Sequence, residues 1–169
     1  MREIGIGLIG CGVVGSGTVS LLTNNAELIA SRVGARLVVR KIAVRDVSKV
    51  RDVQLPADLF TSNVDDVIAD PDIDIVAELV GGVDPAKSWI ESAFAAKKQV
   101  VTANKELMAK HGHALVQIAQ ENKLDFYAEG SVAGGIPIIA AMGESLAANR
   151  VQRVMGIVNG TTKIGRAHV

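Results

Sequence analysis

A glycine-rich segment near the amino terminus, IGIGLIGCGVVGSG, constrains this chain more than any other feature. Gly10, Gly12 and Gly15 have the spacing G-x-G-x-x-G, directly after an apolar strand expected at residues 4–9 and at the start of a predicted helix. Gly10 permits a tight turn, Gly12 lets the backbone approach a pyrophosphate, and Gly15 lets the helix pack closely on the strand. The segment therefore predicts a dinucleotide-binding turn, and a glycine-rich turn without a ligand is the alternative.

Strand-like and helical stretches alternate along the rest of the chain. Strands are expected at residues 4–9, 37–44, 73–79, 99–102 and 124–128, and helices at 13–28, 85–96 and 105–121. This alternation predicts the α/β class, with a Rossmann-type doubly wound parallel sheet. After a glycine-rich turn at 129–137 we expect a helix of small residues to about residue 148 and a final strand at 151–158.

The charge and composition of the chain narrow the classes of partner. Lysine plus arginine and aspartate plus glutamate each number 18, so no basic field is expected to bind nucleic acid. The first apolar run is far shorter than a membrane span or a signal-peptide core, which predicts no membrane association. A single cysteine, Cys11, excludes an internal disulfide and is consistent with the cytoplasm. We therefore expect a small-molecule partner.

The end of the second predicted strand bears on which dinucleotide is bound. An NAD site usually carries an acidic residue there, which binds the ribose hydroxyls. The segment LVVRKIAVRD instead offers Arg40, Lys41 and Arg45, with Asp46 one residue later. A basic group could hold the 2′-phosphate of NADP, so NADP(H) is favoured and NAD(H) is possible. Solvated charges at the end of a strand are the alternative.

Several later motifs turn a general dinucleotide fold into a particular one. After GCGVVG at residues 10–15 come ELVGG at 78–82, VVTANKELMA at 100–109, EGSVAGGIPII at 129–139 and VNGTT at 158–162. In this order and spacing the chain resembles homoserine dehydrogenases over nearly its whole length. The resemblance implies NAD(P)-dependent interconversion of L-homoserine and L-aspartate 4-semialdehyde, on the route to threonine, methionine and isoleucine. It also implies a homodimer formed by the full-length protein.

The resemblance implies roles for particular residues. Lys105, after a strand end, is expected to be catalytic and to contact the cofactor, although a solvated helix start would look similar. A monovalent cation, Na⁺, is expected on backbone oxygens of the glycine-rich turn, for which a structural hinge is the alternative. The expected cofactor contacts are Gly10, Cys11, Gly12, Val13, Val14, Gly15, Arg40, Arg45, Gly81, Thr102 and Lys105; the substrate contacts are Asn159, Gly160 and Thr161; and the cation ligands are Glu129, Val132, Gly134 and Ile136.

The resemblance also divides the chain. Residues 1–130 are predicted to form the NAD(P)-binding domain, and residues 131–163 the beginning of an α+β substrate and dimerisation domain. The last residues, IGRAHV at 164–169, are what ATC GGA AGA GCA CAC GTC encodes, a sequencing-adapter sequence, so we expect this tail to be non-native. A chain of this extent is expected to be weakly active or inactive by itself.

Two other functions fit parts of the pattern. A different Rossmann reductase of small metabolites is one, but an acyl-forming semialdehyde dehydrogenase needs a cysteine nucleophile, and Cys11 lies in the glycine loop. A non-enzymatic nucleotide sensor is the other, since the fold alone does not define a function. The segments VVTANKELMA and EGSVAGGIPII favour the enzyme, because a sensor has no need of a lysine beside the nicotinamide or of a cation loop.

Overall fold

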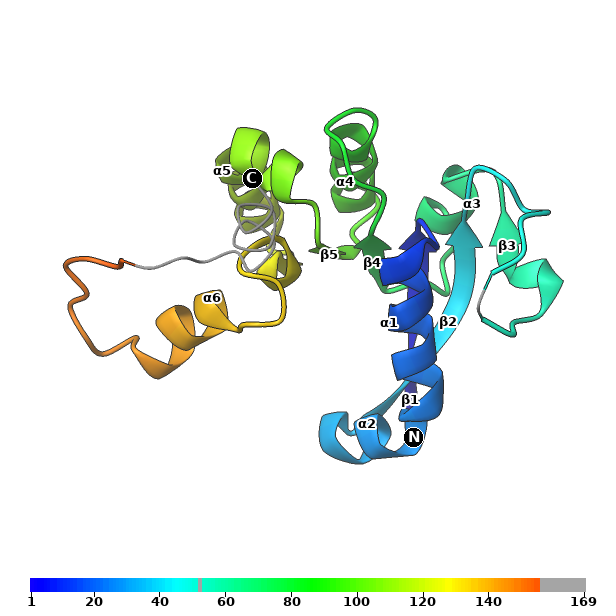
Figure 1. The fold of residues 1–169 in the computed structure, drawn as a ribbon, viewed down its shortest axis with the longest axis horizontal. Helices are drawn as coiled ribbons and strands as arrows, with labels where there is room; N and C mark the ends of the chain where they lie inside the picture. The colour runs from blue at the N-terminus through cyan, green and yellow to red at the C-terminus, as the bar shows by residue number, and fades with distance from the viewer. Residues whose placement is uncertain (52, 156–169) are drawn as a thin grey trace, which may run out of the picture.

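The computed structural model describes residues 1–51 and 53–155, and these residues are built around one parallel sheet (Figure 1). Its six strands lie in the order β3-β2-β1-β4-β5-β6. Their bounds are β1 Arg2–Ile9, β2 Ala35–Ala43, β3 Phe60–Thr61, β4 Ile75–Glu78, β5 Gln99–Thr102 and β6 Phe126–Tyr127. This order is that of the doubly wound dinucleotide fold, and it confirms the predicted α/β class.

Strand β1 lies inside the sheet, hydrogen-bonded to β2 on one side and to β4 on the other. Its side chains alternate between the two faces, as in any strand. Ile6 and Leu8 pack into one apolar cluster, and Ile9 packs into the other. Both faces of β1 are therefore buried, which explains why the strand is apolar on both faces rather than alternately polar.

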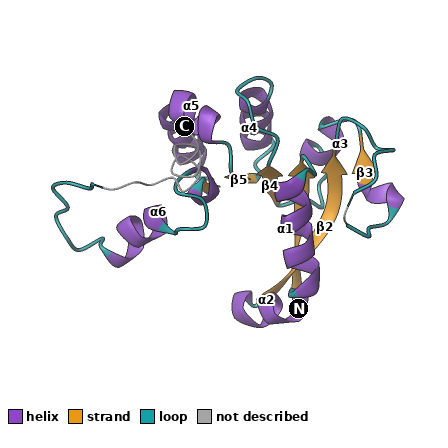
Figure 2. Ribbon diagram, in the orientation of Figure 1, coloured by secondary structure: helices purple, strands orange, loops and turns teal. Residues whose placement is uncertain are grey.

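Helices cover both faces of the sheet (Figure 2). One cluster joins the sheet to α1 Val13–Asn24, which α2 Ala26–Val33 follows. The other cluster joins it to α3 Asp65–Ile68, α4 Ala86–Ala95 and α5 Lys105–Asn122. Over the residues that the structure describes, none of the helices is both long enough and apolar enough to cross a membrane.

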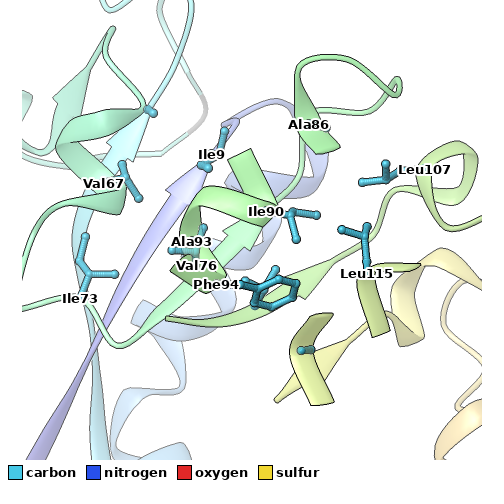
Figure 3. Close-up of a cluster of buried hydrophobic side chains, with 13 residues drawn as sticks. Ile9, Val67, Ile73, Val76, Ala86, Ile90, Ala93, Phe94, Leu107 and Leu115 are labelled. Carbon is cyan, nitrogen blue, oxygen red and sulfur yellow. The ribbon is translucent and has the colours of Figure 1, made fainter. Parts of the chain in front are cut away.

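The larger cluster is centred on helix α4 (Figure 3). Ile90 and Phe94 are fully buried against β4 and β5, and Leu107 and Leu115 of α5 complete the cluster. The ring of Phe94 meets that of Phe126 edge to face, with the ring centroids 5.5 Å apart. These contacts fix α4 and α5 on the sheet, and so determine where the loops that precede both helices lie.

A buried lysine closes the amino edge of the sheet. Lys98 has a relative exposure of 8%, and its Nζ donates hydrogen bonds to the carbonyls of Asp70 (2.6 Å) and Ile73 (2.5 Å). A buried ammonium needs such partners, because leaving it unpaired would carry a large desolvation cost. Lys98 therefore ties the turn before β4 to the end of α4, at the opposite edge from the glycine loop.

The helix predicted at residues 13–28 is wrong, because the structure divides it into α1 and α2. Asn25 has a non-helical backbone (φ −113°, ψ 19°), and its side-chain Nδ2 donates to the carbonyl of Leu21 at 3.1 Å. Asparagine competes for backbone groups in this way and therefore favours helix ends. Strand β3 and helix α3 were not predicted, since elements of two and four residues show no periodicity.

The region after the glycine-rich turn also differs from the prediction. In place of a helix reaching residue 148, α6 spans Ile138–Ala140 and a π-helical turn follows at Ala141–Ser145. No strand forms at residues 151–155, and the remainder of the predicted strand, 156–158, lies outside the described residues. A strand requires a hydrogen-bonded neighbour, and within the described chain none lies beside this segment. The start of a second domain therefore stays a prediction.

We expect Phe94→Ala to lower the free energy of unfolding by about 3–5 kcal/mol, because it removes a fully buried ring and leaves a cavity. Urea unfolding followed by circular dichroism measures the change. Leu21→Ala is the control, because Leu21 is 57% exposed and its truncation should change the free energy by less than about 0.5 kcal/mol. Equal losses in the two variants would contradict the assignment of Phe94 to the core.

Candidate dinucleotide-binding site

A cleft of about 950 Å³ opens at the carboxyl edge of the sheet. Open α/β sheets bind ligands at this edge, where the strand order reverses, which is beside β1 in this fold. The glycine loop, the exits of β2 and β4 and the start of α4 surround the cleft. Its lining residues are Ile9, Gly10, Cys11, Gly12, Ala43, Val44, Arg45, Asp46, Lys49, Arg51, Ser62, Val64, Leu79, Val80, Gly81, Asp84, Pro85 and Trp89.

The three glycines of the loop have different surroundings. Gly10 has a φ of +101°, which L side chains rarely adopt, and its N–H donates to the carbonyl of Ala43 at 2.8 Å. A Cβ added to Gly15 would lie 2.4 Å from the carbonyl oxygen of Gly10, so only glycine permits this close packing. A Cβ on Gly12 would meet nothing within 4 Å, which leaves its backbone open to the cleft. The geometry is that expected of a pyrophosphate turn, and cofactor contact itself stays a prediction.

The next residues of the loop begin helix α1. Val13 and Val14 are 94% and 56% exposed, and Cys11 is buried with its Sγ 3.6 Å from the Ser16 hydroxyl. No side chain caps this end of α1, where Gly12 is the N-cap. Its first backbone N–H groups are therefore available to a phosphate, in line with the positive end of the helix dipole.

The structure brings Arg45 to the cleft but not Arg40. Arg40 lies within β2, before the exit of the strand, and its guanidinium forms an ion pair with Glu3 at 2.5 Å. Strand β2 carries a register irregularity opposite Ile6 and Gly7, so Arg40 has no register partner on β1. Sequence position alone did not reveal that pairing.

Two basic residues that the sequence analysis did not select also line the cleft. Lys49 is exposed there, and Arg51 closes the loop by donating to the carbonyls of Lys49 and Asp46, both at 2.6 Å. The guanidinium of Arg51 also lies over the ring of Phe60, 5.1 Å from its centroid. The run RDVSKVR was the available signal, because it clusters cations directly after the second strand.

Asp46 is occupied by its own loop. Its Oδ1 accepts hydrogen bonds from the hydroxyl of Ser48 (2.6 Å) and from the backbone N–H of Ser48 (2.9 Å). The hydroxyl, and after it the backbone N–H, hold the pKa of Asp46 below its ordinary value because both stabilise the ionised carboxylate. The acidic group nearest the end of β2 is thus already hydrogen-bonded within the protein.

Thr102, Asn104 and Lys105 mark the exit of β5. Thr102 is buried, and its hydroxyl donates to the carboxylate of Glu78 at 2.7 Å. Asn104 caps helix α5, since its Oδ1 accepts from the backbone N–H of Leu107 at 3.1 Å. Lys105 is exposed as the first residue of α5. Thr102 and Lys105 lie at the same edge of the sheet as the cleft but are not among the residues that line it.

Comparison with known proteins identifies the family. Residues 10–129 match the model of the homoserine dehydrogenase NAD-binding domain. The chain belongs to the homoserine dehydrogenase family. This finding confirms the predicted family, and the matched domain is one that binds a nicotinamide dinucleotide.

Individual homoserine dehydrogenases show the extent of the likeness. The chain is 46% identical over 162 residues to the homoserine dehydrogenase of Bacillus subtilis and 45% identical over 161 residues to that of Mycobacterium tuberculosis. A crystal structure of a homoserine dehydrogenase from Thiobacillus denitrificans matches with a TM-score of 0.86 at 44% identity. These matches cover 95–96% of the chain but only 36–37% of the relatives. The chain thus spans little more than a third of these relatives.

The loop that the homoserine dehydrogenase resemblance links to a cation has a turned backbone. Ala133 and Gly135 both have positive φ angles, +57° and +82°, a backbone conformation that turns the chain sharply and is rare for L residues. The carboxylate of Glu129 accepts from the backbone N–H groups of Ile139 (3.0 Å) and Ala140 (2.8 Å), so it caps α6. Val132 is half-buried, and Gly134 and Ile136 are exposed. The described residues contain no group of three or more acidic, histidine or cysteine side chains that could hold a metal ion, so a cation here would depend on backbone oxygens.

The remaining predicted contacts are one cofactor contact, Gly81, and the three substrate contacts. Gly81 lines the cleft and has a positive φ of +88°. Asn159, Gly160 and Thr161, the expected substrate contacts, lie outside the described residues, as does the tail at 164–169.

We expect Ser48→Ala to raise the pKa of Asp46 toward its ordinary value, because the Ser48 hydroxyl is the main cause of the lowering. An NMR titration of the carboxyl carbon measures it. The folded-state pKa is the lowered one, so this contribution to stability is present above the ordinary carboxyl pKa and is lost as the pH falls through the folded value. Ser31→Ala, whose hydroxyl bonds Leu28, should leave the titration unchanged. An unaltered pKa in Ser48→Ala would contradict the hydrogen-bonded loop.

Proposed function

We propose that this chain supplies the cofactor-binding part of an enzyme that interconverts L-homoserine and L-aspartate 4-semialdehyde with NADP(H). The observation that carries the proposal is the glycine loop. Gly12 lies open to a cleft at the point where the strand order reverses, within a domain of the homoserine dehydrogenase family. The described residues suit the cofactor for two reasons. The space beside Gly12 is empty, so a phosphate can approach its backbone, and the first turn of α1 has no side-chain cap, so its N–H groups can bind that phosphate.

The chain contributes position and charge to this chemistry. When bound, the nicotinamide ring supplies or accepts the hydride. The backbone N–H groups at the start of α1 hold the pyrophosphate, and Val80 and Gly81 line the cleft from the exit of β4. Lys105 presents an ammonium group at the exit of β5, where it can bind the substrate carboxylate or move a proton at the reacting oxygen.

The preference for NADP(H) is supported by the charges at the exit of β2. Arg45 and Lys49 line the cleft and are exposed, so both can approach a 2′-phosphate. Asp46, the residue that could bind unphosphorylated ribose hydroxyls, has one carboxylate oxygen, Oδ1, hydrogen-bonded to Ser48. The 2′-phosphate that distinguishes NADP(H) from NAD(H) would therefore meet two cations, Arg45 and Lys49, and one carboxylate that is already hydrogen-bonded.

The wider organisation belongs to the same proposal. A Na⁺ ion is proposed on the carbonyl oxygens of Glu129, Val132, Gly134 and Ile136, supported by the turned backbone of that loop. The division into a cofactor domain at residues 1–130 and the start of a substrate and dimerisation domain at 131–163 is retained. We also propose a cytoplasmic location and a homodimer of the full-length protein, and both proposals are based on the family alone.

We expect the purified 169-residue chain to bind NADPH, and Gly12→Asp to abolish that binding, since a carboxylate at this position would repel the pyrophosphate. Calorimetry measures binding, with homoserine oxidation assayed in parallel. The substitution should leave the fold intact, because a Cβ at Gly12 meets nothing within 4 Å. A folded wild-type chain that binds neither NADPH nor NADH would contradict the proposed function.

We expect Arg45→Ala to weaken NADPH binding by about tenfold and to leave NADH binding nearly unchanged, because only NADPH carries the 2′-phosphate. Calorimetric titrations with both cofactors measure the difference. Arg36→Ala is the matched control, because Arg36 is an arginine of β2 that pairs with Glu27 and does not line the cleft. Equal affinities of the Arg45→Ala and wild-type chains for NADPH would refute the role of Arg45.

A further inference from the structure

Glu78 is a fully buried acidic residue that the proposed chemistry does not use. It ends strand β4, and its relative exposure is 0%. The ion pairs formed among the described residues do not include it. A carboxylate in such a place carries a large desolvation cost unless hydrogen bonds compensate for it, so its partners indicate its role.

Among the described residues, the hydrogen bonds that the Glu78 side chain accepts all come from the carboxyl edge of the sheet. Its Oε1 accepts from the backbone N–H groups of Val80 (2.8 Å) and Gly81 (3.4 Å). Its Oε2 accepts from the hydroxyl of Thr102 (2.7 Å), the residue beside it in the register of β4 and β5. One oxygen thus holds the loop after β4, and the other holds the end of β5.

Asn104 extends this network to the start of α5. Because its backbone N–H donates to the Thr102 hydroxyl at 3.1 Å, the single hydroxyl proton of Thr102 is left for Glu78. The side-chain Nδ2 of Asn104 donates to the carbonyl of Gly82 at 2.6 Å, and its Oδ1 caps α5. The network therefore connects two segments, Val80–Gly82 and the helix start that carries Lys105.

Both segments follow strands of the half of the sheet that is expected to bind the nicotinamide nucleotide. In a doubly wound sheet each half binds one mononucleotide, and the exit of β2 belongs to the half that takes the adenosine. Strands β4 and β5 belong to the other half, which takes the nicotinamide nucleotide. Val80 and Gly81 line the cleft on this side. Glu78 precedes them at the end of β4, and its side chain is hydrogen-bonded to their backbone N–H groups.

We propose that Glu78 is a positioning residue for the nicotinamide half of the cofactor. Through its hydrogen bonds it holds the Val80–Gly82 loop and the start of α5 at one separation, without contacting the cofactor itself. This inference rests on the proposed function. It predicts that the network affects binding of the nicotinamide ring and leaves binding of the adenosine half unaffected.

The test compares NADPH with 2′-phospho-ADP-ribose, which is NADPH without the nicotinamide, in the 169-residue chain. Glu78→Gln keeps the shape of the side chain, but its NH₂ group must face either the backbone N–H groups or the Thr102 hydroxyl. We expect the ratio of the two affinities to fall about tenfold, through weaker NADPH binding alone. NADH paired with ADP-ribose provides the same comparison without the 2′-phosphate.

Two further variants keep the test decisive. Asn104→Asp retains the cap of α5 but loses the donor to Gly82, so it should lower the same ratio even if Glu78→Gln fails to fold. Lys98→Met removes the two hydrogen bonds to the carbonyls of Asp70 and Ile73 at the amino edge, so it should lower the unfolding temperature and leave the ratio unchanged. An unchanged ratio in the folded variants, or equal weakening of both ligands, would overturn the positioning role. A wild-type chain that binds neither ligand would overturn the proposed function, and this inference with it.

Discussion

The close approach of backbone to backbone at the turn between β1 and α1 is the constraint on which the rest of the structure depends. Gly10 bonds the exit of β2, and the first turn of α1 packs against the carbonyl of Gly10 at a distance that excludes any Cβ on Gly15. Because β1 lies between β2 and β4, this turn opens where the two halves of the sheet diverge. The positions of the cleft, of the first N–H groups of α1 and of the loops that line the cleft all follow from that placement.

The two sides of the cleft are stabilised in different ways. On the β2 side the loop carries exposed cations, with Arg51 folded back on its carbonyls and Asp46 bonded to Ser48. On the β4 side the loop is hydrogen-bonded to the buried carboxylate of Glu78. Exposed charges select a ligand through direct contact, whereas a buried and fully hydrogen-bonded group defines the shape of a loop. The cleft thus combines exposed charges on the β2 side with a loop fixed by hydrogen bonds on the β4 side.

Sequence patterns predicted the elements that local signals define. Strand β5 was placed at its observed bounds, and α5 differs from its prediction by one residue, since Asn104 provides a recognisable cap. The break at Asn25 and the short β3 were missed, because a lone asparagine and a strand of two residues give weak local signals. Of the residues that line the cleft, the glycine loop and Arg45 were selected from the sequence, whereas Lys49 and Arg51 were not. Arg40 is paired with Glu3 and does not line the cleft.

The amino-acid sequence by itself determined the α/β class, the glycine loop and the family, because each depends on residue types at fixed spacing along the chain. Only the tertiary structure decided which charges face the cleft and which are paired elsewhere. It also revealed that Glu78 connects the loop after β4 to the end of β5, since Thr102 reaches Glu78 only when β4 and β5 lie side by side. Spacing encodes local conformation, but contacts between residues far apart in the chain depend on how the strands are ordered in the sheet.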